Sequence, residues 1–518
     1  MKKILLILFI PLLSFSQNTN NLFSKKGEVY FSFDYKNKHQ LNELSEIISV
    51  DHKTNSEIAY AYANQKEFTA FIKLGIDYTI IKEEPLNYSQ NSKNNWNYYP
   101  TYEEYVDMMI AFADSFPSIC KLHYLGTLNS GREILIVQIS NNVGQKENEP
   151  SFLYTSSMHG DELAGYILSL RLIDHILHGY GNNLRLTELV DNIDIWINPL
   201  ANPDGTYAGG NQDVWTATRY NANWVDLNRN YPDPEDGAHP DGNPYQTETN
   251  IFIGLADTVN FTISANMHGG AEVCNYPWDT WSTLAADDNW WQHVSREYAD
   301  SCQANSGNGY FEWNNWNNPF ANGVVNGYDW YTVNGGRQDY MNYFKYCREF
   351  TLELSVDKTP NPNDLPSLWD ANYPSLINYM EQILFGLRGI ATDSITGNPL
   401  KVKVEILSHD IDSSHVYSNL PIGNYHRYLY QGNYDVTFSK SGYYPKTINT
   451  TILNNTSTIE NIQLVPINST PTSVTEEVTR KTKNLFIDVL GRNSKQTKNS
   501  IELIKTERST LRKQVTLE

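Results

Sequence analysis

The sequence predicts an α/β protein: a mixed β-sheet flanked by helices, with a small α+β module before it and a β-sandwich after it. Its 518 residues exceed the usual size of one hydrophobic core, so we expect more than one domain. Residues 96–385 alternate apolar, strand-like runs with helical stretches, which is typical of a sheet covered by helices. From Gly386 onward the pattern changes to short strands separated by turns, which favours a sandwich.

The composition indicates a folded protein and excludes one broad class of function. Hydrophobic residues make up 40% of the chain and aromatic residues 13%, which suffices for a packed core and argues against disorder. The formal net charge of −20 would repel phosphates over most of the surface, so we expect no nucleic-acid partner. The charge does not define the substrate, because the charge of a local pocket matters more than the sum.

Residues 1–17 have the layout of a secretory signal peptide. Lys2 and Lys3 precede an apolar run at residues 4–13, and a stretch of small residues follows at 14–17. A buried N-terminal helix is the alternative. No later segment reaches the roughly 20 apolar residues that a membrane-spanning helix needs. We therefore predict a chain that is secreted or located at the cell surface, without a membrane span.

The chain contains four cysteines that could form disulfides after export: Cys120, Cys274, Cys302 and Cys347. An oxidising compartment allows three ways of pairing them, and the sequence does not choose among these.

Residues 18–95 are predicted to form a separate N-terminal module and a linker. Strand-like runs at 29–33, 58–62 and 78–81 alternate with helical patterns at 41–48 and 68–74, which predicts a small βαβαβ unit. The stretch at 83–95 is polar and rich in Asn and Ser, as linkers are. Two interpretations stay open: a pro-segment that covers an active site, or a plain accessory domain.

The central domain is predicted at residues 96–385, and two further segments follow it. Apolar runs at 134–137, 152–154 and 193–197 indicate strands buried on both faces of a sheet. In the predicted sandwich at 386–466, a turn at 396–399 precedes apolar residues at a period of two, namely Val402, Val404 and Ile406. Residues 467–518 begin with a Ser/Thr-rich stretch around Pro471 and are predicted to be a linker and a tail.

A histidine and a glutamate follow one of these apolar runs at a spacing that suits a metal ion. His159 and Glu162 are three residues apart, so a turn or helix that begins there projects both side chains to one side. His268 follows another strand-like run, at 261–267. The carboxyl ends of strands in an open α/β sheet meet at one edge, so we expect the two histidines to meet there. Two imidazoles and one carboxylate suit Zn²⁺, which then keeps an open position for water.

Two arginines and one glutamate add candidates for substrate binding and proton transfer. Arg219 and Arg229 lie at the two ends of a segment that contains Asn and Trp, and an arginine can hold a carboxylate through two hydrogen bonds. Glu353 lies within the apolar strand pattern at 348–354, where an unpaired carboxylate is costly. A general base beside a metal-bound water is the natural function for a glutamate at such a position.

Together these segments resemble the zinc carboxypeptidase family in its regulatory branch, that of carboxypeptidases D, E, N and M, rather than the pancreatic branch. The resemblance covers residues 98–384, and the motifs agree in order and spacing. It implies the family's eight-stranded mixed sheet with flanking helices. It also implies that the chain is a zinc-dependent hydrolase that removes single residues from the C-termini of peptides or proteins.

When each motif is matched to its counterpart in the family, the resemblance implies a role for several residues around the metal. One Zn²⁺ per chain would be held by His159, Glu162 and His268. Asp226 would orient a ligand histidine. Glu353 would be the general base that takes a proton from the zinc-activated water, and Arg219 would polarise the scissile carbonyl.

The same resemblance implies a site for the end of the substrate. Asn228 and Arg229 match the pair that holds the C-terminal carboxylate, and Tyr331 matches the tyrosine that closes over it. These residues need a free carboxylate, which makes an exopeptidase. The expected partners are therefore peptides or proteins with a free C-terminus, while the sequence leaves the oligomeric state open.

Two further positions imply a preference for C-terminal Lys or Arg. Asp279 and Gln338 match positions that line the pocket for the terminal side chain, and this pair accompanies that preference in the family. A buried carboxylate without a cation is costly, and a basic side chain supplies the cation. The alternative is that Asp279 faces solvent or pairs with Arg337.

The segments after the central domain also resemble known sequences. Residues 389–445 resemble the transthyretin-like domain that follows the peptidase in the regulatory branch. The stretches at 484–492 and 511–515 resemble type IX secretion sorting signals, with ordinary disorder as the alternative.

Two alternative classes of function stay open. One is a peptidoglycan-type or amide-specific zinc hydrolase on the same scaffold. The Asn228–Arg229 pair and Asp279 argue against it. The other is a zinc-free binding protein on this fold. Such a protein would have lost ligands or the base, whereas His159, Glu162, His268 and Glu353 are all present.

Overall fold

The computed structural model describes residues 22–23, 26–51, 53–55, 57–82, 95–307, 309–312 and 321–467, and the strands at 486–487, 501–505 and 511–515. The signal peptide predicted at residues 1–17 lies outside the described residues. The chain divides into two units, Met1–Ile467 and Asn468–Glu518. Among the described residues, no helix combines the length and the apolar character needed to cross a membrane.

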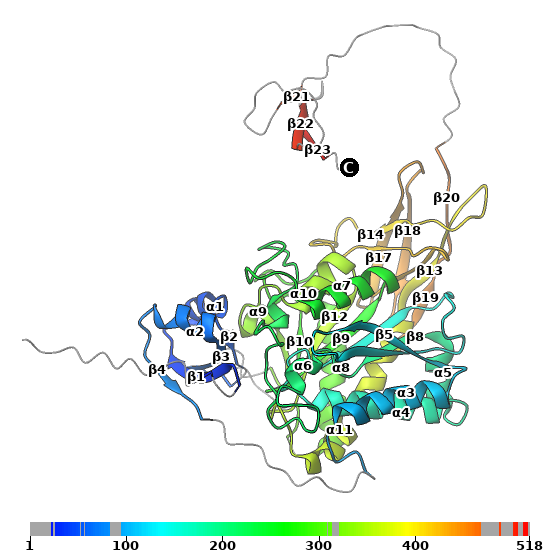
Figure 1. Ribbon diagram of the computed structural model, residues 1–518. Coiled ribbons are helices and arrows are strands. Elements are labelled where there is room, and N and C mark those ends of the chain that lie inside the picture. The colour runs from blue at the N-terminus through cyan, green and yellow to red at the C-terminus, as the bar shows by residue number, and fades with distance from the viewer. Residues whose placement is uncertain are drawn as a thin grey trace, which may run out of the picture. The chain divides into compact units, whose positions relative to one another are not determined.

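The first unit is built on an eight-stranded mixed sheet with the order β11-β10-β12-β9-β7-β8-β6-β5 (Figure 1). Strands β12, β9, β7 and β8 run parallel to one another, and antiparallel pairs join β10 to β12, β8 to β6 and β6 to β5. The α/β fold class predicted from the sequence is confirmed. In chain order the strands are β5 (Cys120–Thr127), β6 (Glu133–Ile139), β7 (Ser151–Ser156), β8 (Asp194–Asn198), β9 (Ile263–His268), β10 (Glu272–Tyr276), β11 (Val324–Asn326) and β12 (Arg348–Leu354).

Alternate residues of the inner strands pack into two different cores, one on each face of the sheet. In β6, Leu135 and Val137 enter one core, while Ile134 and Ile136 enter the other. Successive side chains of a strand point to opposite faces, so a sheet covered on both sides needs apolar residues at nearly every position. This is why the sequence shows continuous apolar runs here instead of alternation.

Helices cover both faces of this sheet (Figure 1). The larger core lies under α3 (Tyr102–Ser115), α4 (Ala164–Gly179), α5 (Leu184–Asn192), α8 (Asp288–Ser306) and α11 (Leu365–Glu381). The opposite face is covered by α7 (Thr247–Val259) and α10 (Arg337–Lys345). Shorter turns are α6 (Pro203–Thr206), η3 (Leu227–Arg229), α9 (Gly327–Trp330), η4 (Pro362–Asp364) and η5 (Gln382–Leu384).

The N-terminal module consists of a four-stranded antiparallel sheet and two helices. Its elements are β1 (Glu28–Asp34), α1 (Lys38–Ser45), β2 (Ser49–Val50), β3 (Ile58–Asn64), α2 (Gln65–Ile72) and β4 (Tyr78–Ile80), with the strand order β2-β3-β1-β4. The side chains of Asn37 and Asn64 cap α1 and α2 by accepting backbone hydrogen bonds. The sequence pattern identified the three longer strands and both helices. It missed β2, because a strand of two residues has no readable period.

Two four-stranded sheets follow the central domain and enclose a core of their own. One has the order β16-β13-β19 with β20 also paired to β13, and the other has the order β15-β14-β17-β18. Apolar residues such as Val404, Tyr425 and Phe438 fill the space between them. The strands are β13 (Gly386–Asp393), β14 (Lys403–Glu405), β15 (Val416–Tyr417), β16 (Asn424–Arg427), β17 (Gly432–Ser439), β18 (Lys446–Ile452), β19 (Ser457–Ile459) and β20 (Ile462–Leu464). The likeness to a transthyretin-like domain stays a prediction.

The second unit contains one small antiparallel sheet, formed by β21 (Phe486–Ile487), β22 (Ile501–Lys505) and β23 (Leu511–Val515). The stretch at 484–492 lies mostly outside the described residues, so its interpretation as a sorting signal stays a prediction.

The four cysteines are buried and none of them forms a disulfide within the part of the chain that the structure describes. Burial raises the pKa of the Cys120 and Cys302 thiols to about 12, so both are protonated at neutral pH. They pack as small apolar side chains.

Candidate active site

The three metal-ligand candidates meet at the carboxyl ends of two neighbouring strands. His159 and Glu162 follow β7, and His268 is the last residue of β9, which pairs with β7 in parallel. Oε2 of Glu162 lies 3.0 Å from Nδ1 of His159 and 2.8 Å from Nδ1 of His268. The two Nδ1 atoms are 3.1 Å apart. The structure therefore brings together the ligand set predicted from the sequence.

This donor set fits zinc. One ligand atom from each residue lies within 4.8 Å of the others, and all three side chains are buried. Ligand atoms on a tetrahedral zinc are separated by roughly 3.3 Å, since each bond is about 2.0–2.1 Å long. Burial lowers the pKa of His268 to about 4, which keeps its imidazole neutral and able to bind a metal at pH 7. Burial alone would raise the pKa of Glu162, but His159, Lys358 and His268 hold it well below its usual range.

The loop that carries His159 and Glu162 is fixed by contacts to a second loop. The Asn202 side chain donates to the carbonyl oxygens of Met158 and Tyr220 and accepts from the Gly205 N–H. A Cβ on Gly160 would lie only 2.3 Å from the backbone of Gly205, so only glycine fits this close approach. The turn formed by Asn202 and Gly205 thus holds the metal-binding loop in place.

Each histidine has a polar partner on its outer nitrogen. Nε2 of His159 lies 3.0 Å from Oδ1 of Asp226, as the resemblance implied. Nε2 of His268 lies 2.7 Å from the carboxamide of Asn266, a contact that sequence reasoning missed. Asn266 is two residues before His268 on the same strand, so both side chains point to one face. That spacing was the available signal. Such partners fix the ring that binds the metal.

Arg219 lies against the metal ligands. Its Nε and Nη2 atoms lie 3.0 and 2.9 Å from Oδ2 of Asp226. Its Nη1 lies 3.1 Å from Nδ1 of His159 and 3.4 Å from Oε1 of Glu162. Burial would raise the pKa of Asp226, but the charge of Arg219 and then of His159 holds it well below its usual range. Asp226 is therefore ionised and can accept a hydrogen bond from His159.

Glu353 lies on β12, directly beside His268 of β9 in the sheet register. Its side chain is 2% exposed, and it lines the same cavity as the two histidines. Burial, and then the charge of Glu162, raises its pKa well above the usual range. A carboxyl group whose pKa is raised in this way is suited to accept and return a proton near neutral pH.

Lys358 is a residue of the site that sequence reasoning missed. Its Nζ lies 3.1 Å from Oε1 of Glu162 and 3.8 Å from Oδ2 of Asp161. A single lysine after a strand carries no signal in the sequence, because lysines are most often solvated. The structure gives it a role: a cation that offsets the buried carboxylates beside the metal ligands.

A small buried cavity joins the metal site to the predicted substrate residues. Its volume is about 20 Å³. The residues around it include most of the site candidates: His159, Arg219, Asn228, Arg229, His268, Asp279, Tyr331 and Glu353. Glu162, Asp226 and Gln338 lie one layer behind, and each bonds to a residue that lines the cavity. Every predicted site residue is thus part of one cluster.

Arg229 has unused hydrogen-bond donors at this cavity. Its Nη1 donates to the carbonyl oxygen of Asn228 at 2.8 Å. Its Nε and Nη2 atoms are buried and have no hydrogen-bond partner among the described residues. A buried donor without a partner is costly, so these two N–H groups are arranged for an acceptor that comes from outside the chain. Two adjacent guanidinium donors match a carboxylate.

Asp279 is buried at the cavity and forms no ion pair with any arginine that the structure describes. It is 3% exposed and accepts hydrogen bonds from Gln338, at 2.9 Å, and from Asn275, at 3.1 Å. The two alternatives for it, exposure to solvent or a pair with Arg337, are wrong. Arg337 pairs instead with Glu349, at 3.0 Å. Burial raises the pKa of Asp279 to about 7, and the hydrogen bond from Asn275 and the charge of Arg229 offset this only in part.

The sequence matches known proteins over the same segment. Residues 105–375 match the family model described as zinc carboxypeptidase. Mouse carboxypeptidase M is 36% identical over 64% of this chain and 75% of its own length, and the mouse carboxypeptidase N catalytic chain is 32% identical over 68% and 82%. Mouse carboxypeptidase D is 34% identical over 66% of this chain, but the match spans only 25% of that longer protein.

Two solved structures share the fold at low identity. Carboxypeptidase A from Helicoverpa armigera superposes with a TM-score of 0.52 at 18% identity, covering 69% of this chain and 97% of its own. Thrombin activatable fibrinolysis inhibitor superposes with a TM-score of 0.51 at 14% identity, covering 68% and 98%. At these identities the likeness concerns the fold alone.

Proposed function

The chain belongs to the zinc carboxypeptidase family, and on this premise we propose that it hydrolyses the last peptide bond of peptides or proteins. One observation supports this best. The unused donors of Arg229 lie at the same cavity as Glu353 and the metal-ligand candidates, so a C-terminal carboxylate bound there would place its peptide bond beside the catalytic groups.

The residues of the site have separate functions in hydrolysis. Zn²⁺, the family's cofactor, would be held by His159, Glu162 and His268, and when bound it supplies a Lewis acid that lowers the pKa of a water molecule. Glu353 accepts the proton of the attacking water and returns it to the leaving amine. Arg219 donates to the oxygen of the scissile carbonyl as negative charge develops there. If His159 used Nδ1 to hold the metal, Arg219 would lose its Nη1 contact to that atom, and its Nη1–H would be available to the substrate.

Three residues of the cavity recognise a free C-terminus. Arg229 binds the carboxylate through Nε and Nη2, Asn228 lies beside it, and Tyr331 covers the bound end. An endopeptidase or an amide-specific hydrolase has no use for two buried guanidinium donors that lack a partner. We therefore assign an exopeptidase.

A matched pair of peptides tests the exopeptidase assignment. One peptide ends in a free carboxylate and the other in an amide, with the same sequence. We expect kcat/KM to fall by about a hundredfold or more for the amide, because Arg229 then lacks its charged partner. Mass spectrometry of the products measures this directly. Equal rates on both peptides, or cleavage at internal bonds, would show that the site does not select a C-terminus.

Asp279 and Gln338 support a preference for C-terminal Lys or Arg. The Asp279 carboxylate is buried at the cavity, and the Gln338 amide orients it from behind. A substrate ammonium or guanidinium would supply the missing cation. This specificity rests on the resemblance and on the burial of Asp279.

We further propose that the chain is exported, on the strength of the charged and apolar pattern at residues 1–17 and of the tail. Protein recovered from its native host should then begin near residue 17 or 18, or near residue 95 if the N-terminal module has been removed. It should also lack the tail if sorting removes it. Mass spectrometry of both termini decides this, and an intact chain in the cytoplasm would rule out export.

A further inference from the structure

Two adjacent residues of α10 hold Asp279, one by its side chain and the other by its backbone. The Gln338 side chain donates to Oδ1 of Asp279 at 2.9 Å, and the carboxylate of Asp339 accepts from the backbone N–H of Asp279. Gln338 and Asp339 both lie in the first turn of this helix. One helical turn therefore fixes both the carboxylate that would meet the substrate and the backbone that carries it.

Asp339 contacts this backbone at three points. Its Oδ2 lies 3.0 Å from the backbone nitrogen of Asp279 and 2.9 Å from that of Thr280, and its Oδ1 lies 3.1 Å from the nitrogen of Asp279. The N–H of Val333 donates to the carbonyl oxygen of Asp279 at 3.3 Å. Both peptide groups that flank Asp279 are thus held by hydrogen bonds.

Asp339 itself lies in a costly environment. It is 0% exposed, its hydrogen bonds all come from backbone N–H groups, and no cation pairs with it among the described residues. Burial, and then the charge of Asp279, raises the pKa of Asp339 well above its usual range, and the N–H groups of Thr280 and Asp279 oppose this. An apolar side chain would avoid the cost of a buried carboxyl group but would leave these N–H groups without an acceptor.

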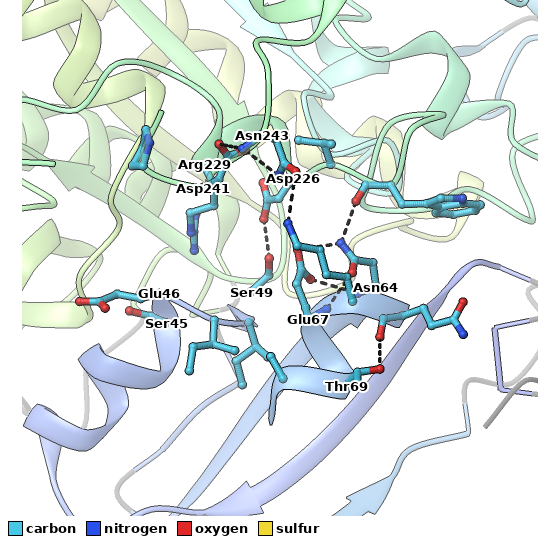
Figure 2. Close-up of a pocket in the computed structure, with 18 of the residues that line it drawn as sticks. Ser45, Glu46, Ser49, Asn64, Glu67, Thr69, Asp226, Arg229, Asp241 and Asn243 are labelled. Carbon is cyan, nitrogen blue, oxygen red and sulfur yellow. Dashed lines mark hydrogen bonds between the residues drawn. The ribbon is translucent and has the colours of Figure 1, made fainter. Parts of the chain in front are cut away.

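The charge of Arg229 acts on Asp279, but Arg229 does not pair with it. This guanidinium lines the small cavity together with Asp279, and it also lines a larger cleft of about 1,080 Å³ beside Asp226 and Asp241 (Figure 2). Two of its donors have no partner among the described residues. A cation for Asp279 must therefore come from the substrate, and the position of Asp279 decides where that cation binds.

The same turn of α10 also contacts a residue proposed to bind the substrate's terminal carboxylate. The backbone N–H of Arg337 donates to Oδ1 of Asn228 at 2.9 Å. Asn228 and Asp279 both line the cavity. Because Arg337, Gln338 and Asp339 are consecutive, this turn sets the distance between the two points at which a C-terminal basic residue would be held.

We propose that Asp339 is a positioning residue for substrate specificity, which fixes the backbone of Asp279 and Thr280 so that the Asp279 carboxylate faces the terminal side chain of a basic substrate. The proposal rests on the function proposed above, including the preference for C-terminal Lys or Arg. Asp339 does not line the cavity, so it acts through Asp279. Its loss weakens the discrimination between side chains and leaves hydrolysis itself in place.

The first test compares the full parent chain with Asp339→Ala on blocked dipeptides that end in Arg or in Phe. We expect Asp339→Ala to lower the ratio of kcat/KM for Arg over Phe by at least about tenfold, mainly through a higher KM for the Arg peptide. The kcat/KM for the Phe peptide should change by less than about threefold, because a Phe side chain gains nothing from the Asp279 carboxylate.

Two further variants separate positioning from charge and from a general effect. Asp339→Asn should keep most of the ratio, because one amide oxygen can replace Oδ2, which accepts from both N–H groups. The matched control is Asp393→Ala in the sandwich. Asp393 also accepts from two backbone N–H groups, those of Ile395 and Thr396, but it lies outside the site. We expect it to leave the ratio unchanged.

Hydrogen exchange gives a readout that does not depend on activity. The amides of Asp279 and Thr280 should exchange at least about tenfold faster in Asp339→Ala than in the parent, because they lose their acceptor. In Asp339→Asn these amides should stay protected.

Unchanged exchange of these two amides in Asp339→Ala would overturn the proposal, and so would an unchanged ratio for Arg over Phe. An equal fall in kcat/KM for both peptides would also overturn it, since Asp339 would then support the site as a whole. The same holds for an equal loss in Asp339→Asn and Asp339→Ala, because charge and not position would then matter. A parent chain that hydrolyses neither peptide contradicts the proposed function instead, and faster exchange in Asp339→Ala would still support the positioning of Asp279.

Discussion

Replacement of Glu353 by Gln is expected to lower kcat by about a thousandfold while zinc stays bound. The amide keeps the size of the side chain but cannot accept the proton of the attacking water. Zinc binding should persist, because Glu353 is not one of the three residues whose donor atoms converge in the metal site. The loss should appear in kcat with little change in KM, since the side chain acts on the reacting atoms.

The measurement is steady-state kinetics together with metal analysis of the same preparation. Glu272→Gln is a suitable control, because Glu272 lies on the adjacent strand β10 but does not line the cavity. It should leave kcat unchanged. A Glu353→Gln chain that keeps a tenth of the parent kcat would contradict the assignment of the base.

C-terminal Arg and Lys are expected to exceed Phe and Leu by at least about 100-fold in kcat/KM, or ~2.7 kcal/mol. The reason is the buried Asp279, whose carboxylate is held by the amides of Gln338 and Asn275 and gains a cation from a basic substrate. Asp279→Ala should remove most of this difference and leave zinc in place, because Asp279 is not one of the three metal-ligand candidates.

A panel of blocked dipeptides that differ only in the last residue measures the preference. Asp257→Ala controls for a general loss of negative charge, since Asp257 is exposed and pairs with Lys345. A parent chain that prefers Phe or Leu would refute the pocket assignment and leave the carboxypeptidase assignment standing.

Much of the fold and of the site follows from local patterns in the sequence. Continuous apolar runs identify strands buried on both faces, and the ends of parallel neighbours must lie together. His159 follows one such strand, and His268 ends another. The residue pattern alone was therefore enough to predict that the two histidines meet.

The parts of the site that could not be predicted from the sequence depend on tertiary contacts. Lys358 and Asn266 are ordinary residues in their local segments, and each gains its role only from the side chains that folding places beside it. The same holds for Asp279. Its position relative to Arg337 was open in the sequence, and the turn of α10 directs Arg337 toward Glu349 instead.

The most direct test of the whole account is a zinc titration of the metal-free full chain. The account predicts that activity on a free C-terminus returns in proportion to bound zinc and reaches its limit at one zinc per chain, from the cluster of two histidines and one glutamate. Full activity in chains shown to contain no zinc would contradict it.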